Sequence, residues 1–273
     1  MTGERHPNAR PGDYVLGVDS GSLTAKAVIM DRNRRIISSN VAQLGFVSKK
    51  ALQTAVDGAL GLANLAFSDM AYVVATGYGR LAYADADREI TEISCHARGA
   101  HYLLPDVRTV IDIGGQDSKI ISVGPSGSFT NFAMNEKCAA GTGKFLQVMA
   151  TALGVELEQI GELSLQAQNE LHISSTCTVF AETEVISLVA QEHALPDILA
   201  AIHESIASRM LTLAGRVTLT EPVMMTGGVA RNVGLVKTLE RVLNIDINVS
   251  GDPQIAGAIG AAMFAADAAG WAR

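Results

Sequence analysis

The stretch Asp112-Ile113-Gly114-Gly115-Gln116-Asp117-Ser118-Lys119 decides how the rest of the chain can fold. Apolar residues from Thr109 precede it and further apolar residues follow it, so the pattern predicts two strands joined by a tight turn. The spacing Asp-x-Gly-x4-Lys also occurs earlier, at Asp19, Gly21 and Lys26, again between apolar runs. Two turns with the same spacing, each opening a hairpin, indicate a duplicated lobe.

The composition is that of a globular α/β protein with room for two lobes. The chain has 273 residues, of which 48% are hydrophobic and 18% charged, so it can bury a substantial core. The net charge is −7 and the isoelectric point is near 5.4, so the chain lacks the excess of basic residues that is typical of nucleic-acid-binding proteins. We therefore expect no nucleic-acid partner.

Hydropathy and the start of the chain predict where the protein is found. No run approaches the roughly 18 apolar residues that a membrane-spanning helix needs, and the start lacks the apolar core of a signal peptide. Residues 1–12 contain two prolines, two glycines and several charges, which predicts a disordered tail. We expect a cytoplasmic protein that has no membrane partner.

Apolar periodicity, followed outward from the two turns, predicts an α/β fold in two lobes. Lobe one is expected at 13–105, completed by a C-terminal helix at 254–270, and lobe two at 106–253. The predicted strands are 14–18, 25–30, 36–43, 73–77, 127–134, 223–226 and 245–249, and the predicted helices are 49–65, 93–104, 142–153, 180–192, 197–216, 235–243 and 254–269.

The two turns and a glycine pair predict a site for a magnesium nucleotide. Gly21 lets backbone N–H groups approach a phosphate, and hydroxyls and a lysine follow it in the same turn. In the second turn, Asp112 is expected to hold magnesium or its water ligands, and Gln116 to orient an attacking water. Gly227-Gly228 stands between a strand and a helix, where the adenosine end of a nucleotide can lie against backbone.

Two common nucleotide-binding motifs are excluded. A Walker P-loop would need Ser or Thr after Gly143-Lys144, but Phe145 stands there, and Cys138 occupies the position of its first glycine. Gly227-Gly228 lacks the Gly-x-Gly-x-x-Gly spacing of a dinucleotide fingerprint. The hairpin turns remain as the candidate phosphate sites.

The three cysteines form no Cys-x-x-Cys pair, which argues against a disulfide scaffold or an ordinary zinc site. Cys138 precedes a small-residue loop that is expected to approach a phosphate, and Cys177 opens a predicted helix, whose N-terminus favours the negative charge of a thiolate-bound cluster. Because a cubane cluster usually takes four thiolates, two copies of the chain would supply these two cysteines twice and leave Cys95 out. Three buried structural thiols are the alternative.

A family resemblance becomes specific at these motifs. The turns at Asp19 and 112–117, with 226–228, resemble the superfamily of acetate and sugar kinases, chaperone ATPases and actin, which implies two ribonuclease H-like lobes clasping a nucleotide in a cleft. Residues 14–265 resemble the ATP-dependent activators of 2-hydroxyacyl-CoA dehydratases and the ATPase subunits of benzoyl-CoA reductases. The stretches that carry the second resemblance are 76–80, 94–97, 112–117, 135–145, 174–186 and 226–232.

That resemblance implies a homodimer in which Cys138 and Cys177 bind one [4Fe–4S] cluster across the interface. It also implies hydrolysis of ATP with Mg²⁺ through Asp112 and Gln116, coupled to one-electron transfer. The electron would come from a reduced ferredoxin or flavodoxin and pass to an iron–sulfur dehydratase or reductase. The implied nucleotide contacts are Asp19, Gly21, Ser22, Leu23, Thr24, Ala25, Lys26, Gly114, Gly115, Gly227 and Gly228.

Several functions remain open from the sequence. The activator of a 2-hydroxyacyl-CoA dehydratase is slightly preferred over the ATPase subunit of a benzoyl-CoA reductase. A small-molecule kinase, such as an amino-sugar kinase of the same superfamily, would need a catalytic base and would have no use for Cys138 or Cys177. A nucleotide-gated assembly without redox chemistry would contain no iron.

Overall fold

The computed structural model describes residues 12–43, 48–135, 138–174 and 177–271, which form two compact units. The first unit takes in the described chain up to Asp106, Val123–Phe129 and the chain from Gln254 onward, and the second takes in Val107–Ser122 and Thr130–Pro253. The sequence prediction places 123–129 in lobe two. This segment belongs instead to the first unit, where Arg98 Nη1 donates to the Ser126 carbonyl at 3.1 Å.

Some sequence predictions fall on residues outside the described ranges. These are 1–11 of the predicted tail, 136–137 beside Cys138 and 175–176 before Cys177. Gly12, the last residue of the predicted tail, is described, and its amide donates to the Asp69 carbonyl at 3.1 Å. Gly12 is thus bound to the first unit, and the tail predicted for the residues before it lies outside the described ranges.

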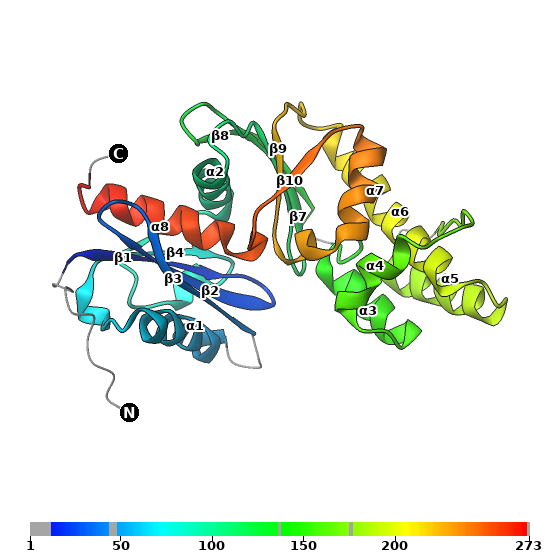
Figure 1. The fold of residues 1–273 in the computed structure, drawn as a ribbon, viewed down its shortest axis with the longest axis horizontal. Coiled ribbons are helices and arrows are strands. Elements are labelled where there is room, and N and C mark those ends of the chain that lie inside the picture. Colours follow the sequence, from blue (N-terminus) through cyan, green and yellow to red (C-terminus); the bar gives the residue numbers. More distant parts are fainter. Residues whose placement is uncertain (1–11, 44–47, 136–137, 175–176, 272–273) are drawn as a thin grey trace. The chain divides into compact units, whose positions relative to one another are not determined.

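The first unit is built on a five-stranded sheet with the order β3-β2-β1-β4-β5 (Figure 1). β1 pairs antiparallel with β2 and parallel with β4, so Asp19 lies opposite Lys26 on one side and Thr76 on the other. The strands are β1 (Tyr14–Ser20), β2 (Thr24–Asp31), β3 (Ile36–Gln43), β4 (Met70–Gly77) and β5 (Arg88–Glu89), with short 3-10 turns η1 (Phe67–Asp69) and η2 (Arg80–Ala82) beside β4.

Helices cover both faces of this sheet because neighbouring residues of a strand point to opposite sides. Leu16 joins the core under α1 (Ser48–Ala63), whereas Val15 joins the core under α8 (Ala256–Ala268). α8 also packs along α2 (Glu92–Leu103), and η5 (Pro253–Ile255) leads into it (Figure 1). The end of the chain thus completes the fold of its beginning.

Small residues let α8 approach β1 and α2 closely. A Cβ added to Gly260 would lie 1.8 Å from the Cys95 carbonyl oxygen, and one added to Gly17 would lie 2.1 Å from the Ala258 carbonyl oxygen. A Cβ on Gly257 would lie 3.0 Å from a histidine ring nitrogen. The close packing predicted from the glycines of this helix is confirmed.

The second unit repeats the strand order of the first, as β8-β7-β6-β9-β10. β6 pairs antiparallel with β7 and parallel with β9, so Asp112 lies opposite Lys119 and Thr226, in the register that Asp19 has in the first unit. This equality of order and register confirms the predicted duplication. The strands are β6 (Thr109–Ile113), β7 (Ser118–Val123), β8 (Phe129–Asn135), β9 (Val223–Thr226) and β10 (Ile247–Val249).

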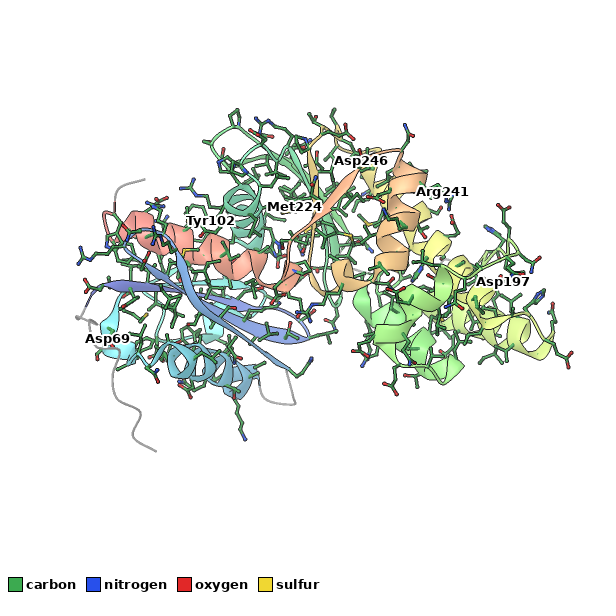
Figure 2. The ribbon with its side chains drawn as sticks, in the orientation of Figure 1. Asp69, Tyr102, Asp197, Met224, Arg241 and Asp246 are labelled. Atoms are coloured by element: carbon green, nitrogen blue, oxygen red, sulfur yellow. The ribbon has the colours of Figure 1, made fainter. Side chains whose placement is uncertain are left out.

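A large apolar core, with Phe145, Met149 and Ile202 fully buried, joins this second sheet to its helices. At the start of α6, Asp197 accepts hydrogen bonds from the Gln168 amide (2.7 Å) and the Asn169 side chain (2.8 Å) (Figure 2). These bonds lower the pKa of Asp197. The helices are α3 (Gly143–Leu153), η3 (Leu157–Gln159), α4 (Ile160–Ser164), α5 (Thr178–Ala190), α6 (Leu195–Ala214), η4 (Gly228–Arg231) and α7 (Val233–Leu243).

The predicted secondary structure is confirmed for the long elements. The strands predicted at 36–43 and 223–226 coincide with β3 and β9. The missed elements are β5 and α4, which are two and five residues long and too short to show a period. Among the helices of the described residues, none combines the length and apolar character needed to cross a bilayer.

Candidate functional site

The first predicted turn is a tight hairpin between β1 and β2. The Gly21 amide donates to the Thr24 carbonyl at 3.1 Å and closes it. Lys26 Nζ lies 3.1 Å from Asp19 Oδ2, and the two side chains are only 12% and 5% exposed. Residues 21–23 at the tip are half-buried. One carboxylate and one ammonium therefore neutralise each other directly beneath the turn.

Ala25, predicted as a nucleotide contact, has a side chain that faces inward. It is completely buried in the core under α1, so within the first unit it supports the turn from below. Ser22 and Leu23 keep the partial exposure that a ligand contact requires. Among the predicted contacts of this turn, the side chains of Ser22 and Leu23 are partly exposed, whereas that of Ala25 packs in the core beneath them.

The second turn has the same backbone but a different arrangement of charge. The Gly114 amide donates to the Asp117 carbonyl at 2.9 Å. Lys119 Nζ lies 2.6 Å from Asp117 Oδ2 and 3.2 Å from Asp112 Oδ2, and the lysine side chain is 2% exposed. The Thr226 hydroxyl donates to Asp112 Oδ1 at 2.8 Å. Both oxygens of Asp112 therefore have protein partners, and the group of two carboxylates and one ammonium keeps a net negative charge.

A Thr-Gly pair lies at the end of β4 and again at the end of β9, at 76–77 and 226–227. Both glycines have positive φ, 86° and 87°. A Cβ would lie 2.4 Å from the Ser20 carbonyl oxygen in the first unit and 2.3 Å from the Ile113 carbonyl oxygen in the second. Gly227, predicted as a nucleotide contact, is thus required by the approach of β6. The Thr-Gly dipeptide that follows an apolar run in both places is the sequence signal that could have found this second repeat.

The remaining predicted residues of the second unit lie at its surface. Gln116 is exposed at the tip of the turn, and Gly115 beside it is half-buried. Gly228 is half-buried in η4. The amide side chain of Gln116 is therefore available to a ligand or a water.

The loop after Cys138 leads into a helix start whose first amides bind the second turn. The Gly143 amide donates to the Gly114 carbonyl at 2.9 Å, and the Lys144 amide donates to the Gly115 carbonyl at 2.8 Å. The first amides of α3, which a helix leaves for an external acceptor, are thus occupied by the second turn. The start of α3 thus holds the turn that is predicted to bind phosphate. The approach of the loop itself to a phosphate stays a prediction.

The three cysteines have different environments. Cys95 is fully buried, and burial raises its pKa to about 12. Cys138 is half-buried in the loop five residues before α3, and Cys177 is exposed at the N-cap of α5. The thiols of Cys138 and Cys177 are the two that a metal cluster can reach.

The donor set fits a cluster shared between two copies of the chain. No group of three or more His, Cys, Asp or Glu side chains within the described ranges is arranged to hold a metal ion. Two accessible thiols per chain supply the four thiolates of a cubane cluster only when two chains combine. The N-terminus of α5 favours negative charge at Cys177, and Val179 and Phe180 beside it are each 66% exposed. These apolar side chains suit a site from which water is excluded.

A buried polar pair that sequence reasoning missed fixes the segment after Gly227-Gly228. The Asn232 side chain accepts from the Leu235 amide at 2.9 Å and so caps α7. Its amide nitrogen lies 3.0 Å from Nε2 of the fully buried His203 on α6. His203 Nε2 is therefore the acceptor and the ring is neutral. A lone histidine within an apolar helical stretch gave no sequence signal for this role.

Acid is expected to destabilise the protein through His203. Burial lowers the pKa of His203 from 6.5 to about 4, so the unfolded chain binds a proton that the folded chain excludes between these values. The free energy of unfolding should fall as the pH drops below 6.5, by about 3 kcal/mol at pH 4 from this group. Urea unfolding of the parent and of His203→Gln across this pH range measures it. An equal slope in both proteins would contradict the assignment.

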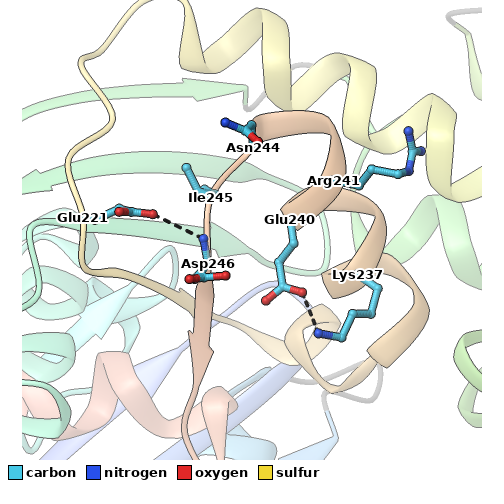
Figure 3. Close-up of a pocket in the computed structure, with 7 residues that line it drawn as sticks. All are labelled: Glu221, Lys237, Glu240, Arg241, Asn244, Ile245 and Asp246. Carbon is cyan, nitrogen blue, oxygen red and sulfur yellow. Dashed lines mark hydrogen bonds and ion pairs between the residues drawn. The ribbon is translucent and has the colours of Figure 1, made fainter.

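An open pocket on the second unit lies apart from the predicted residues (Figure 3). Two of its acidic side chains are bound within the pocket: Lys237 Nζ donates to Glu240 Oε2 at 2.7 Å, and the backbone amide of Asp246 donates to Glu221 Oε1 at 3.3 Å. These contacts stabilise the joint between α7 and β10. The lining residues are Glu221, Lys237, Glu240, Arg241, Asn244, Ile245 and Asp246.

The chain is similar to known proteins along nearly its whole length. The model of the BadF/BadG/BcrA/BcrD ATPase family matches residues 16–265. The activator of lactoyl-CoA dehydratase from Anaerotignum propionicum is 48% identical over 256 residues, covering 94% of this chain and 98% of that protein. The structure of the activator of the 2-hydroxyisocaproyl-CoA dehydratase from Clostridium difficile with bound ADPNP has a TM-score of 0.91 and 45% identity, covering 94% of this chain and 96% of that one. A benzoyl-CoA reductase subunit from Thauera aromatica is 36% identical over 262 residues, covering 92% of this chain and 93% of that protein.

Proposed function

Because the chain belongs to the BadF/BadG/BcrA/BcrD ATPase family, we propose that it hydrolyses ATP to drive low-potential single-electron transfer to an enzyme that acts on CoA esters. The observation that carries this proposal is that two accessible cysteines, Cys138 and Cys177, lie in the same unit as the turn at 112–119. An ATPase without redox chemistry has no use for this pair.

Different residues of the chain bind the phosphates, hold the magnesium ion and orient the attacking water. The turn at 21–24 offers backbone amides and hydroxyls as phosphate contacts, and the turn at 114–117 offers backbone amides. Asp112 is fixed by Lys119 and by the threonine of β9, so in this proposal it orients the water ligands of Mg²⁺. Gln116 is exposed at the tip and orients the attacking water.

In this proposal, the two accessible cysteines bind the group that transfers the electron. Cys138 and Cys177 from each of two chains hold one [4Fe–4S] cluster, which supplies one-electron transfer when bound. The α5 N-terminus stabilises the negative charge at Cys177. The side chains of Val179 and Phe180, exposed in the single chain, would shield the site from water in the dimer. The homodimer is thus part of the proposal, because one chain offers only half of the ligands.

The proposed partner is a 2-hydroxyacyl-CoA dehydratase with its own iron–sulfur centre. Support comes from the identities: 48% and 45% to the two activators, against 36% to the benzoyl-CoA reductase protein. A reduced ferredoxin or flavodoxin in the cytoplasm is the proposed electron donor. A role as the ATPase component of a benzoyl-CoA reductase remains the second choice within the same chemistry.

Iron content tests the proposal directly. Protein purified without oxygen should contain about four irons and four sulfides per dimer. Cys138→Ala and Cys177→Ala should each abolish the cluster, because each removes two of four ligands. Cys95→Ala, a matched control at a buried thiol, should retain it. Iron-free protein that phosphorylates a sugar would overturn the proposal in favour of a kinase.

Gln116→Ala is expected to lower kcat for ATP hydrolysis about a hundredfold, the usual size for loss of a group that acts on the attacking water. The KM for ATP should change little, because the amide acts on the water. Gln53→Ala, at an exposed position of α1, is the control. A rise in KM with unchanged kcat would assign Gln116 to binding instead.

A further inference from the structure

We propose that the first residues of α3 are positioning residues that carry the nucleotide state of the second turn to Cys138. The proposal rests on the function proposed above. Its basis is a pair of main-chain hydrogen bonds: the Gly143 amide to the Gly114 carbonyl at 2.9 Å, and the Lys144 amide to the Gly115 carbonyl at 2.8 Å. The turn that would bind phosphate and the helix that follows a cluster cysteine are therefore joined by backbone alone.

This joint has no spare room. A Cβ on Gly143 would lie 3.2 Å from the Gly114 carbonyl oxygen and 3.5 Å from the Gly115 Cα. It would also lie 3.3 Å from a methyl group of Val229, which belongs to η4 after the glycine pair. The helix start thus touches both segments of the second unit that are predicted to contact nucleotide. A small displacement of either segment moves α3, because close-packed atoms transmit it.

The loop between α3 and Cys138 is short and held along its length. Asn135 Nδ2 donates to the Cys138 carbonyl at 3.0 Å, and the Thr142 amide donates to the Ala139 carbonyl at 3.1 Å. Thr142 is fully buried. Gly141 has a φ of 89° and lies against Arg209 of α6, whose Cδ is 3.2 Å from the position of an added Cβ. The loop therefore moves with the helix start instead of absorbing its motion.

A nucleotide that contacts the amides of residues 115 and 116 must hold the turn differently from the free state if it is to act on Cys138. The same two hydrogen bonds then place α3 and the loop in a different position. The effect is reciprocal: whatever binds Cys138 changes nucleotide affinity by the same factor. The turn and the Cys138 loop thus change conformation together, and both the nucleotide and a ligand of Cys138 shift this equilibrium.

Thiol reactivity measures this link without the cluster. In metal-free Cys177→Ser protein, a maleimide modifies Cys138, while buried Cys95, with its pKa raised to about 12, does not react. Saturating ADPNP should change the rate of Cys138 modification by about fivefold relative to nucleotide-free protein, a typical coupling between two sites. An unchanged rate, with ADPNP shown to bind by calorimetry, would overturn the link and leave the ATPase proposal intact.

Two variants then locate the link. Lys144→Pro removes the amide that donates to Gly115, at a first-turn position where a helix tolerates proline. Lys144→Ala keeps that amide and removes only a side chain that binds Gln147. The nucleotide effect on Cys138 should disappear in Lys144→Pro and remain in Lys144→Ala. The same effect in both would overturn the proposal.

Gly143→Ala provides a second, independent disturbance. Its added methyl group must push the second turn, whereas Gly251→Ala, in the same unit, meets nothing within 4 Å. Alanine also favours the helical state, so the variant is expected to fold. In anaerobic holoprotein, Gly143→Ala should keep its iron and lose the change that ADPNP causes in the EPR spectrum of the reduced cluster. A full change in this variant, equal to that of Gly251→Ala, would contradict the proposed path.

Discussion

Lys119→Met is expected to lower the free energy of unfolding of the second unit by about 3–5 kcal/mol, the usual cost of leaving a buried charge without its partner. The ammonium lies between Asp112 and Asp117, which are 2% and 5% exposed. Methionine fills similar space and leaves two buried carboxylates facing each other. Hydrogen exchange of residues 109–123 measures the loss within the second hairpin.

Two further variants test whether the loss comes from the unpaired carboxylates. Lys26→Met, the matched change in the first turn, removes an ion pair with the single carboxylate Asp19 and should cost about half as much. Asp117→Asn added to Lys119→Met should recover about 1–2 kcal/mol, because it removes one of the two uncompensated charges. Equal losses in both turns, or no recovery, would show that the network contributes less than its burial implies.

Gly260→Ala is expected to destabilise the first unit by about 3 kcal/mol or more, at the upper end of overpacking effects. The added Cβ would lie 1.8 Å from the Cys95 carbonyl oxygen, and this backbone cannot move without separating α8 from α2. Trp271, the single tryptophan, packs beside α8. Its fluorescence during urea unfolding therefore reports this unit.

Gly61→Ala is the matched control for this substitution. Gly61 is exposed on α1, and a Cβ there meets nothing within 4 Å, so alanine should stabilise the protein by about 0.5–1 kcal/mol through helix propensity. The two glycine-to-alanine changes thus have opposite expected signs. A Gly260→Ala protein as stable as the parent would mean that α8 can withdraw from the sheet without loss.

Much of the fold follows from the sequence because the repeat is carried by polar residues at fixed spacing. Asp19 and Asp112 each end an apolar strand, and each requires a glycine turn and a returning strand with a lysine. The strand order and register that result are equal in the two units. Cys177 was also placed correctly at the start of a helix, since the apolar period begins directly after it.

The details of the candidate site depend on contacts between distant segments, which spacing does not encode. Lys119 marks the repeat in the sequence, but only the fold shows that its side chain reaches a second carboxylate. Gly143 looks like part of a phosphate loop, and its amide is instead used by the Gly114 carbonyl. His203 is one of several polar residues of α6, and its partner lies 29 positions away.

The place of α8 in the first unit has a consequence for synthesis on the ribosome. Val15 and Val74 face α8, which is made only from the last 18 or so residues of the chain. The second unit is therefore complete in sequence while one apolar side of the earliest sheet is still uncovered. The half of the protein that is translated first thus finishes folding last, and a purified chain truncated after Pro253 should lose β1 to protease while the second unit resists.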